Sequence, residues 1–291
     1  MELSWPMKLR IAAAVAAGVV LIGIMAWPMA EPSEEIGAIS YGDAVTLVIL
    51  AFLTGLIGYF VSWPYGREIG ILAVPSGLAI WAVRSRSVMA LMQLNATVSQ
   101  RQVILASLKW EPIFWLFVVA AGFAGVLLGQ KIRSSLKTKQ MQEKSKSNLD
   151  KYLKEVITLV GSVLVAQFCI RIFAQDVKIF DNNMGTVVAQ PAVGQIVFAV
   201  SVSFGLAAFL FKKYLNTSYI CPIIASVFIT AYAASSYAKH LQYLVQYWPA
   251  TFFSNAVVSI LPIQMVAFGT LGSIAGYWMA VRSNYWREHD N

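Results

Sequence analysis

The chain has 291 residues, of which 58% are hydrophobic and only 12% carry a charge. Soluble domains have about 25% charged residues, so this composition, with a mean hydropathy of +0.65, excludes an ordinary soluble protein and predicts an integral membrane protein. The net charge of +8 does not indicate a nucleic-acid partner, because the basic residues flank apolar runs and form no basic face with aromatic platforms.

Charge-free apolar runs predict eight transmembrane helices, and the expected fold class is an all-α membrane protein. The runs cover residues 11–30, 44–63, 69–83 and 112–130, then about 156–174, 192–211, 216–237 and 260–281. Most reach the roughly 20 residues that cross a bilayer, whereas the third has only 15 between Glu68 and Arg84. The first run also resembles a signal peptide, but its length favours a helix that is retained.

The distribution of Lys and Arg predicts which side of the membrane each loop occupies. With eight spans and the N-terminus inside, 15 of the 22 basic residues fall on the cytoplasmic side and seven on the outer side. We therefore expect a multi-pass protein of a plasma or bacterial inner membrane, with both termini in the cytoplasm. The basic segment 131–154 is then a cytoplasmic linker that is either solvated or in contact with anionic lipid.

The two halves of the chain match when they are offset by 147 residues. Gly58 and Gly205 are separated by this interval, as are Pro75 and Pro222. Three glycines of the fourth span also recur in the eighth, and the predicted spans pair in order. We expect an internal duplication, although Gly and Pro are common in membrane helices and coincidence is the alternative. The expected domains are a first four-helix repeat, the linker and a second four-helix repeat, at 1–130, 131–154 and 155–291.

Each repeat contains an even number of helices, so both repeats enter and leave the membrane on the same side. This arrangement predicts parallel repeats related by an axis along the membrane normal.

Closely spaced glycines in the fourth and eighth spans predict tight helix packing. Gly125 and Gly129 have GxxxG spacing, which lets two helix backbones approach closely in a bilayer. The complete set of packing glycines is Gly122, Gly125, Gly129, Gly269, Gly272 and Gly276. We expect these residues to pack inside the bundle, with a homodimer contact as the alternative.

Two long segments on the predicted outer side, 87–110 and 239–261, mix apolar and polar residues. Each lies between the last two spans of its half. We expect amphipathic segments that lie in the membrane interface. For the second segment, a re-entrant hairpin near Pro249 is the alternative.

Prolines interrupt the third and seventh spans at corresponding positions, and such paired breaks are typical of a transporter binding site. Each proline removes a backbone donor and frees a carbonyl about one turn earlier, near Ile71 and near Ser218. Freed carbonyls and nearby hydroxyls would bind a neutral or weakly polar solute. The candidate site comprises Pro75, Ser76, Gly77, Ser218, Pro222 and Ser226. The alternative is an ordinary proline kink that neighbouring helices satisfy.

Ionisable residues are rare inside the predicted spans, which disfavours ion-coupled transport. Arg171, near the outer end of the fifth span, either reaches the outer headgroups or contacts an anion or lipid. His240 and His289 lie outside the spans, so a haem held within the membrane is not expected. The sequence has no recognisable catalytic or metal-binding motif, and we expect neither an enzyme nor a cofactor.

Two classes of function fit these features. One is a permease or channel for an uncharged or weakly polar solute, with a site between the repeats. The other is a non-catalytic scaffold or accessory subunit of a larger membrane complex. The expected partners are the lipid bilayer and other membrane protein subunits, with no nucleic acid.

Overall fold

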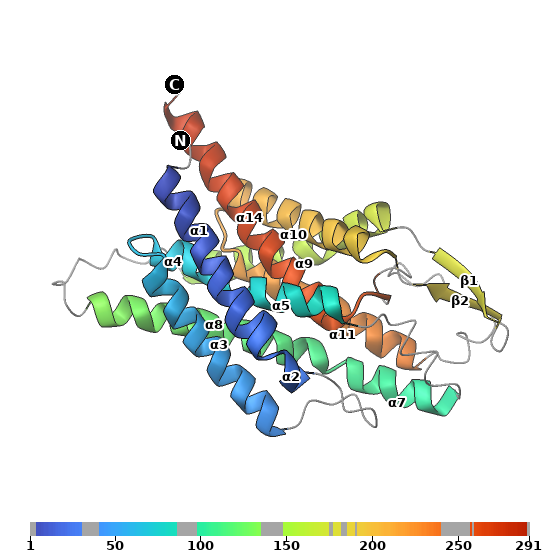
Figure 1. The fold of residues 1–291 in the computed structure, drawn as a ribbon. Coiled ribbons are helices and arrows are strands. Elements are labelled where there is room, and N and C mark those ends of the chain that lie inside the picture. Colours follow the sequence, from blue (N-terminus) through green and yellow to red (C-terminus); the bar gives the residue numbers. More distant parts are fainter. Residues whose placement is uncertain are drawn as a thin grey trace. The chain divides into compact units, whose positions relative to one another are not determined.

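Figure 1 shows the helices and strands of the computed structural model. The chain divides into two compact units. Unit 1 contains Met1–Ala82 and Trp115–Ser145, and unit 2 contains Val83–Phe114 and Lys146–Asn291. The structure describes residues 4–30, 41–85, 98–134, 148–174, 177–181, 185–189, 191–239, 257 and 259–289.

The described part of unit 1 is helical. Its first span is α1 (Trp5–Gly18), which continues as the π-helix η1 (Val19–Met25) and precedes the short α2 (Trp27–Ala30). The second span is α3 (Tyr41–Val61), and the fourth is α8 (Glu111–Ser134). The third span is divided into α4 (Gly66–Ile69), the 3-10 helix η2 (Gly70–Leu72) and α5 (Ala73–Arg84).

Proline and glycine determine the turn between α3 and α4. Pro64 lies just beyond the end of α3, and it lacks the backbone N–H that a continuing helix would need. The hydroxyl of the buried Ser62 donates to the Gly58 carbonyl and satisfies an acceptor near the helix end. A side chain at Gly70 would meet the backbone of Tyr59, so only a glycine lets the third span start this close to α3.

The described part of unit 2 contains four long helices and a hairpin. The helices are α9 (Asn148–Phe173), α10 (Val193–Leu215), α11 (Ile220–Lys239) and α14 (Pro262–His289). Between α9 and α10, β1 (Val177–Asp181) pairs with β2 (Gly185–Ala189) in an antiparallel hairpin, drawn in yellow in Figure 1. The expectation of an all-α fold describes the spans but omitted this hairpin.

The first predicted interfacial segment, 87–110, contains the helix α7 (Val98–Leu108). This helix packs against α11, so a piece of the first half of the sequence belongs to unit 2. The compact units follow packing, and the expected division into repeats at 1–130 and 155–291 stays a prediction. Residues 87–97, 240–256 and 258 of the two predicted interfacial segments lie outside the described residues.

The predicted linker 131–154 is helical at both ends. Its first residues, up to Ser134, complete α8, and its last residues, from Asn148, begin α9. Residues 135–147 lie outside the described residues.

Among the described helices, six are long and apolar enough to cross a membrane. They are Trp5–Met25, Tyr41–Val61, Gly66–Arg84, Ala106–Arg133, Tyr152–Phe173 and Val193–Leu215. The seventh predicted span forms α11, whose apolar stretch Ile220–Ser235 is shorter. The eighth forms α14, a helix of 28 residues that is less apolar because it includes Gln264, Thr270 and Ser273. The sequence thus located eight helices, of which six have the length and hydropathy of a membrane span.

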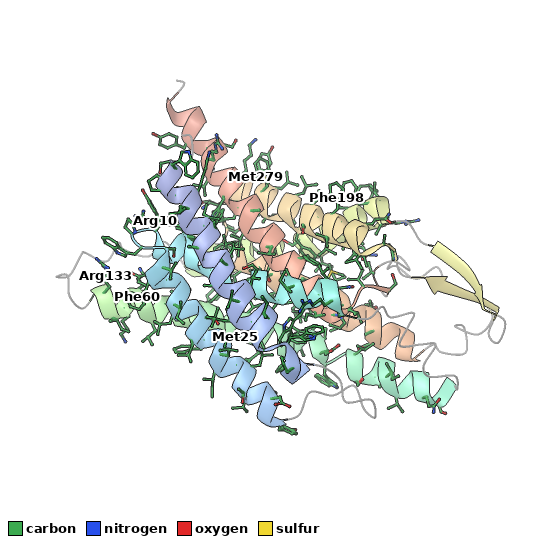
Figure 2. All side chains as sticks on the ribbon, in the orientation of Figure 1. Arg10, Met25, Phe60, Arg133, Phe198 and Met279 are labelled. Atoms are coloured by element: carbon green, nitrogen blue, oxygen red, sulfur yellow. The ribbon has the colours of Figure 1, made fainter. Side chains whose placement is uncertain are left out.

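Large apolar side chains are exposed along the helices of both units. Phe60 of α3 is 48% exposed, and Phe198 of α10 and Met279 of α14 are each 55% exposed (Figure 2). Exposed apolar surface of this extent is expected where helices face lipid. Together with the long apolar helices, it indicates a multi-pass membrane protein.

Candidate functional site

The candidate site residues of unit 1 lie at the start of α5, directly after η2. Pro75 is the third residue of α5, and the residue one turn earlier, Ile71, lies in η2 and not in α5. A proline is tolerated at this position. The third span is interrupted by η2, which contains Ile71, the residue near which Pro75 was predicted to free a carbonyl.

Ser76 and Gly77 make contacts inside unit 1: the Ser76 hydroxyl bonds to its own helix, and Gly77 packs against η1. The Ser76 hydroxyl donates to the Leu72 carbonyl at 2.6 Å and lies 2.9 Å from the Ala73 carbonyl oxygen. A methyl group on Gly77 would lie 2.7 Å from Cβ of Ile22, so the absence of a side chain lets α5 approach η1. A methyl group on Gly18 would overlap the Ala73 carbonyl in the same way. The start of α5 is therefore closed by α1 and η1.

The corresponding residues of unit 2 lie at the start of α11. Pro222 is buried and is again the third residue of its helix. Ser218 is exposed, and its hydroxyl oxygen accepts a bond from the Ile220 N–H at 3.4 Å. Ser226 is buried and donates to the Ile223 carbonyl at 2.7 Å. Like the Ser76 hydroxyl, the Ser226 hydroxyl is thus bonded to its own helix.

The six candidate residues fall into two groups of three, one in each unit. Within each group the proline and one serine lie in the first two turns of a helix. Their role in binding a solute stays a prediction.

The glycines of α8 face two other helices of unit 1. A methyl group on Gly125 would overlap the Phe52 carbonyl oxygen of α3 and lie 2.9 Å from the Leu56 nitrogen. Gly129 faces the ring of Tyr59, also on α3, and Gly122 faces Val74 of α5. These glycines let α8 approach α3 and α5 closely.

The glycines of α14 make the same kind of contact in unit 2. A methyl group on Gly272 would overlap the Ser201 carbonyl, and one on Gly276 would overlap the Gly205 carbonyl, both on α10. A methyl group on Gly269 would lie 3.1 Å from Cβ of Ser226 on α11. All six glycines named from the sequence are buried in contacts inside their own unit.

A cluster of three tryptophans in unit 1 was not predicted. The ring centroids of Trp27 and Trp81 are 6.0 Å apart with an interplanar angle of 77°, and those of Trp81 and Trp115 are 6.0 Å apart at 88°. Both pairs are edge-to-face, the arrangement that aromatic rings prefer. Trp81 is only 1% exposed. The three residues come from three separate segments, so spacing along the chain gives no sign of their contact.

Arg171 is exposed in the last turn of α9, the predicted end of the fifth span. An exposed guanidinium at this position can reach lipid headgroups. Across the described ranges, no three His, Cys, Asp or Glu side chains lie together as a metal-binding group, and Cys169 and Cys221 are free thiols.

In comparisons with known family models, curated proteins and solved structures, the chain matched none. The contacts described above therefore carry the functional proposal.

Proposed function

We propose that this protein is a non-catalytic scaffold or accessory subunit of a larger complex in a plasma or bacterial inner membrane. The observation that carries the proposal is the closed packing at the start of α5 and of α11. The hydroxyls of Ser76 and Ser226, which a solute would need, donate to carbonyls of their own helices. Close glycine contacts fill the space beside them, between Gly77 and Ile22 and between Gly269 and Ser226.

The proposal includes an internal duplication of a four-helix unit. In its support, α5 begins at Ala73 and α11 at Ile220, which are 147 residues apart. In both units, glycines of the fourth helix also face the backbone of the second helix. A duplicated, glycine-packed bundle suits a component whose outer surfaces contact other membrane proteins.

The proposal also places both termini in the cytoplasm. In unit 1, three basic segments are brought to one end by contacts among Arg10, Tyr65, Trp63 and Arg133. A concentration of Lys and Arg at one end of a membrane bundle marks the cytoplasmic side.

A permease for an uncharged or weakly polar solute is the second candidate. The observation that favours it is the interrupted third span, in which η2 separates α4 from α5. Transporters use such interruptions to expose backbone carbonyls to a solute. In this alternative, Pro75 and Pro222 are the first residues to examine for a role in solute passage.

Solute flux separates the two candidates. The purified protein is reconstituted into liposomes, and the uptake of glycerol and of urea is followed by stopped-flow light scattering. The scaffold proposal predicts rates equal to those of protein-free liposomes. Uptake that is several-fold faster, and that changes in Ser76→Ala or Ser226→Ala, would establish the permease instead.

A second measurement gives the scaffold a positive test. Native membranes are solubilised in a mild detergent, and the protein is followed by native gel electrophoresis. The scaffold is expected to migrate in an assembly larger than the purified protein in the same detergent. Migration at the size of the purified protein would count against it.

A further inference from the structure

We infer that one end of unit 1 binds the phosphate headgroups of anionic phospholipids. We define the basic end of unit 1 by its cations and the aromatic rings that hold them: Lys8, Arg10, Trp63, Tyr65, Arg67, Lys131 and Arg133. This inference goes beyond the proposed function and does not depend on it.

Two cation–π contacts join the segments of the basic end. The guanidinium carbon of Arg133, in the last turn of α8, lies 3.8 Å from the centroid of the Trp63 ring. The guanidinium carbon of Arg10, in α1, lies 5.9 Å from the centroid of the Tyr65 ring. Figure 2 shows Arg10 and Arg133 at the same end of unit 1. The turn between α3 and α4 thus positions two arginines from distant parts of the sequence.

An aromatic ring lies beside each arginine, and Arg133, at 3.8 Å from the Trp63 centroid, is close enough to stack on its ring. A guanidinium that rests on an aromatic face presents its N–H groups at its edge, in the geometry that two phosphate oxygens accept. The ring also restricts the arginine side chain before the ligand arrives, which lowers the ordering cost of binding. Arg10 and Arg133 are partly exposed, and the rings of Trp63 and Tyr65 are 43% and 42% exposed. The pairs therefore lie at the surface, within reach of a headgroup.

The charge of the basic end matches an anionic partner. Five basic residues belong to it, and the exposed Glu68 of α4 is the acidic residue among the described parts of these segments. Five positive charges and one negative charge give a net +4. This charge lies at the end of membrane-spanning helices, the level at which phosphates of the bilayer are found. Aromatic rings favour the same level. The lipid headgroup is therefore the anion that this geometry fits.

Unit 2 contains a cation–π contact that differs in the features relevant to phosphate binding. The Lys212 ammonium nitrogen lies 4.8 Å from the Tyr277 ring centroid and also donates to the Asn216 side-chain oxygen at 2.6 Å. An ammonium lacks the planar fork of a guanidinium, and here one of its donors is already used. We expect this contact to bind anionic lipid more weakly, which makes it a matched internal control.

Native mass spectrometry tests the inference on the full chain. The protein is delipidated in a neutral detergent and titrated with phosphatidylglycerol or with phosphatidylcholine, and bound lipids are counted. We expect tighter binding of phosphatidylglycerol and at least a fivefold loss of its affinity in the double variant Arg10→Gln, Arg133→Gln. The double variant Lys212→Gln, Lys213→Gln removes the same charge and should change the affinity less than twofold. Equal losses in the two double variants would overturn the assignment to the basic end.

Three further measurements distinguish the effect of charge from that of the guanidinium fork, and a lipid headgroup from free phosphate. Arg133→Lys keeps the charge but loses the fork, and its affinity should fall between those of the wild type and the double arginine variant. Inorganic phosphate at millimolar concentration should not displace phosphatidylglycerol, and displacement would assign the site to free phosphate. Equal binding of phosphatidylglycerol and phosphatidylcholine by the wild-type protein would also overturn the inference. This comparison uses no variant, so it holds even if a variant fails to fold.

Discussion

Under the proposed duplication, α3 of unit 1 corresponds to α10 of unit 2, and the two units differ after this helix. In unit 1, α3 ends at Val61 before Pro64, and residues Gly66–Leu72 then form α4 and η2. In unit 2, the residues 147 positions later, 213–219, form the end of α10 and a loop. No proline interrupts α10, which continues to Leu215. One proline thus decides whether these residues extend the second helix or begin the third.

This difference explains why Gly58 and Gly205, which correspond under the proposed duplication, have different neighbours. A methyl group on Gly58 would lie 3.1 Å from the Gly70 oxygen of η2 and 3.0 Å from Cβ of Ala73. Unit 2 has a loop where unit 1 has η2, and Gly205 faces Gly272 of α14 at 3.3 Å instead. The early start of the third span in unit 1 therefore occupies the face of Gly58.

The crossing of the second and fourth helices uses a corresponding glycine in the two units. A methyl group on Gly125 would overlap the Phe52 carbonyl of α3, and one on Gly272, 147 residues later, would overlap the Ser201 carbonyl of α10. Subtracting 147 from 201 gives 54, so the facing carbonyl lies two residues further along the second helix in unit 2. The helix pair and the glycine of the fourth helix are thus kept, while the facing position on the second helix shifts.

The largest difference between the units should appear at Trp81 and at Phe228, which corresponds to it under the proposed duplication. Trp81 is 1% exposed and contacts two other tryptophans, whereas Phe228 is 55% exposed. We expect Trp81→Ala to lower the free energy of unfolding by about 3–5 kcal/mol, because it leaves a cavity in a packed core. Phe228→Ala should cost less than about 0.5 kcal/mol, as expected at an exposed position. Thermal unfolding midpoints of the purified proteins in detergent give the comparison, and equal shifts would contradict it.

The glycine pair Gly129 and Gly276 should show the next largest difference. A methyl group on Gly276 would overlap the Gly205 carbonyl, which is backbone and cannot move without separating the helices. At Gly129 the nearest atom, at 2.6 Å, belongs to the Tyr59 ring, which can rotate away. We expect Gly276→Ala to cost about 3 kcal/mol and Gly129→Ala about 1 kcal/mol in the same unfolding assay.

Gly194→Ala serves as the control for this pair. A methyl group on Gly194 would meet no atom within 4 Å, so this substitution should cause no loss of stability. A loss at Gly129 as large as that at Gly276 would mean that Tyr59 is held rigidly and that the two crossings are equally strict.

The end of α10 provides a test of smaller size. Asn216 has φ of 52° and ψ of 41°, a left-handed conformation, and accepts a bond from Lys212. Asn216→Ala should lower stability by about 1 kcal/mol, because alanine adopts this conformation at a cost. Asn216→Gly loses the same side-chain bond but keeps the backbone freedom, and it should be nearly neutral. If both variants lose equally, the bond to Lys212 and not the backbone conformation matters at this helix end.

The helices were predictable from the sequence because a bilayer imposes a simple pattern. Apolar runs between charges located eight helices, and the spacing of Gly125 and Gly129 indicated close packing. The eighth run was predicted as a span, but α14 is not among the six apolar helices, since it contains small and polar residues such as Thr270 and Ser273. Local patterns thus located the helices, but they did not determine which helices are long and apolar enough to cross a membrane.

The contacts between distant segments were not predictable in this way. Trp63 and Arg133 lie 70 residues apart, and their interaction follows from the turn after α3 and from the length of α8. The helix α7 belongs to unit 2 because it packs against α11, and the sequence contains no periodic pattern that indicates this contact. The hairpin had a local signal that went unused, namely apolar and β-branched residues on either side of a DNNMG turn.

The paired prolines allow the smallest and most discriminating test. Because Pro75 and Pro222 are both the third residue of a helix, each replaces an N–H that would have no acceptor within that helix. We expect Pro75→Ala and Pro222→Ala each to change stability by less than about 1 kcal/mol, through the entropy of the unfolded chain. Under the scaffold proposal, glycerol uptake in liposomes also stays at the protein-free rate in both variants. The opposite outcome is that the wild-type protein passes glycerol and that both substitutions alter this flux while stability is unchanged. The prolines would then act in solute passage. The proposed duplication would in that case concern a transport path as well as helix packing.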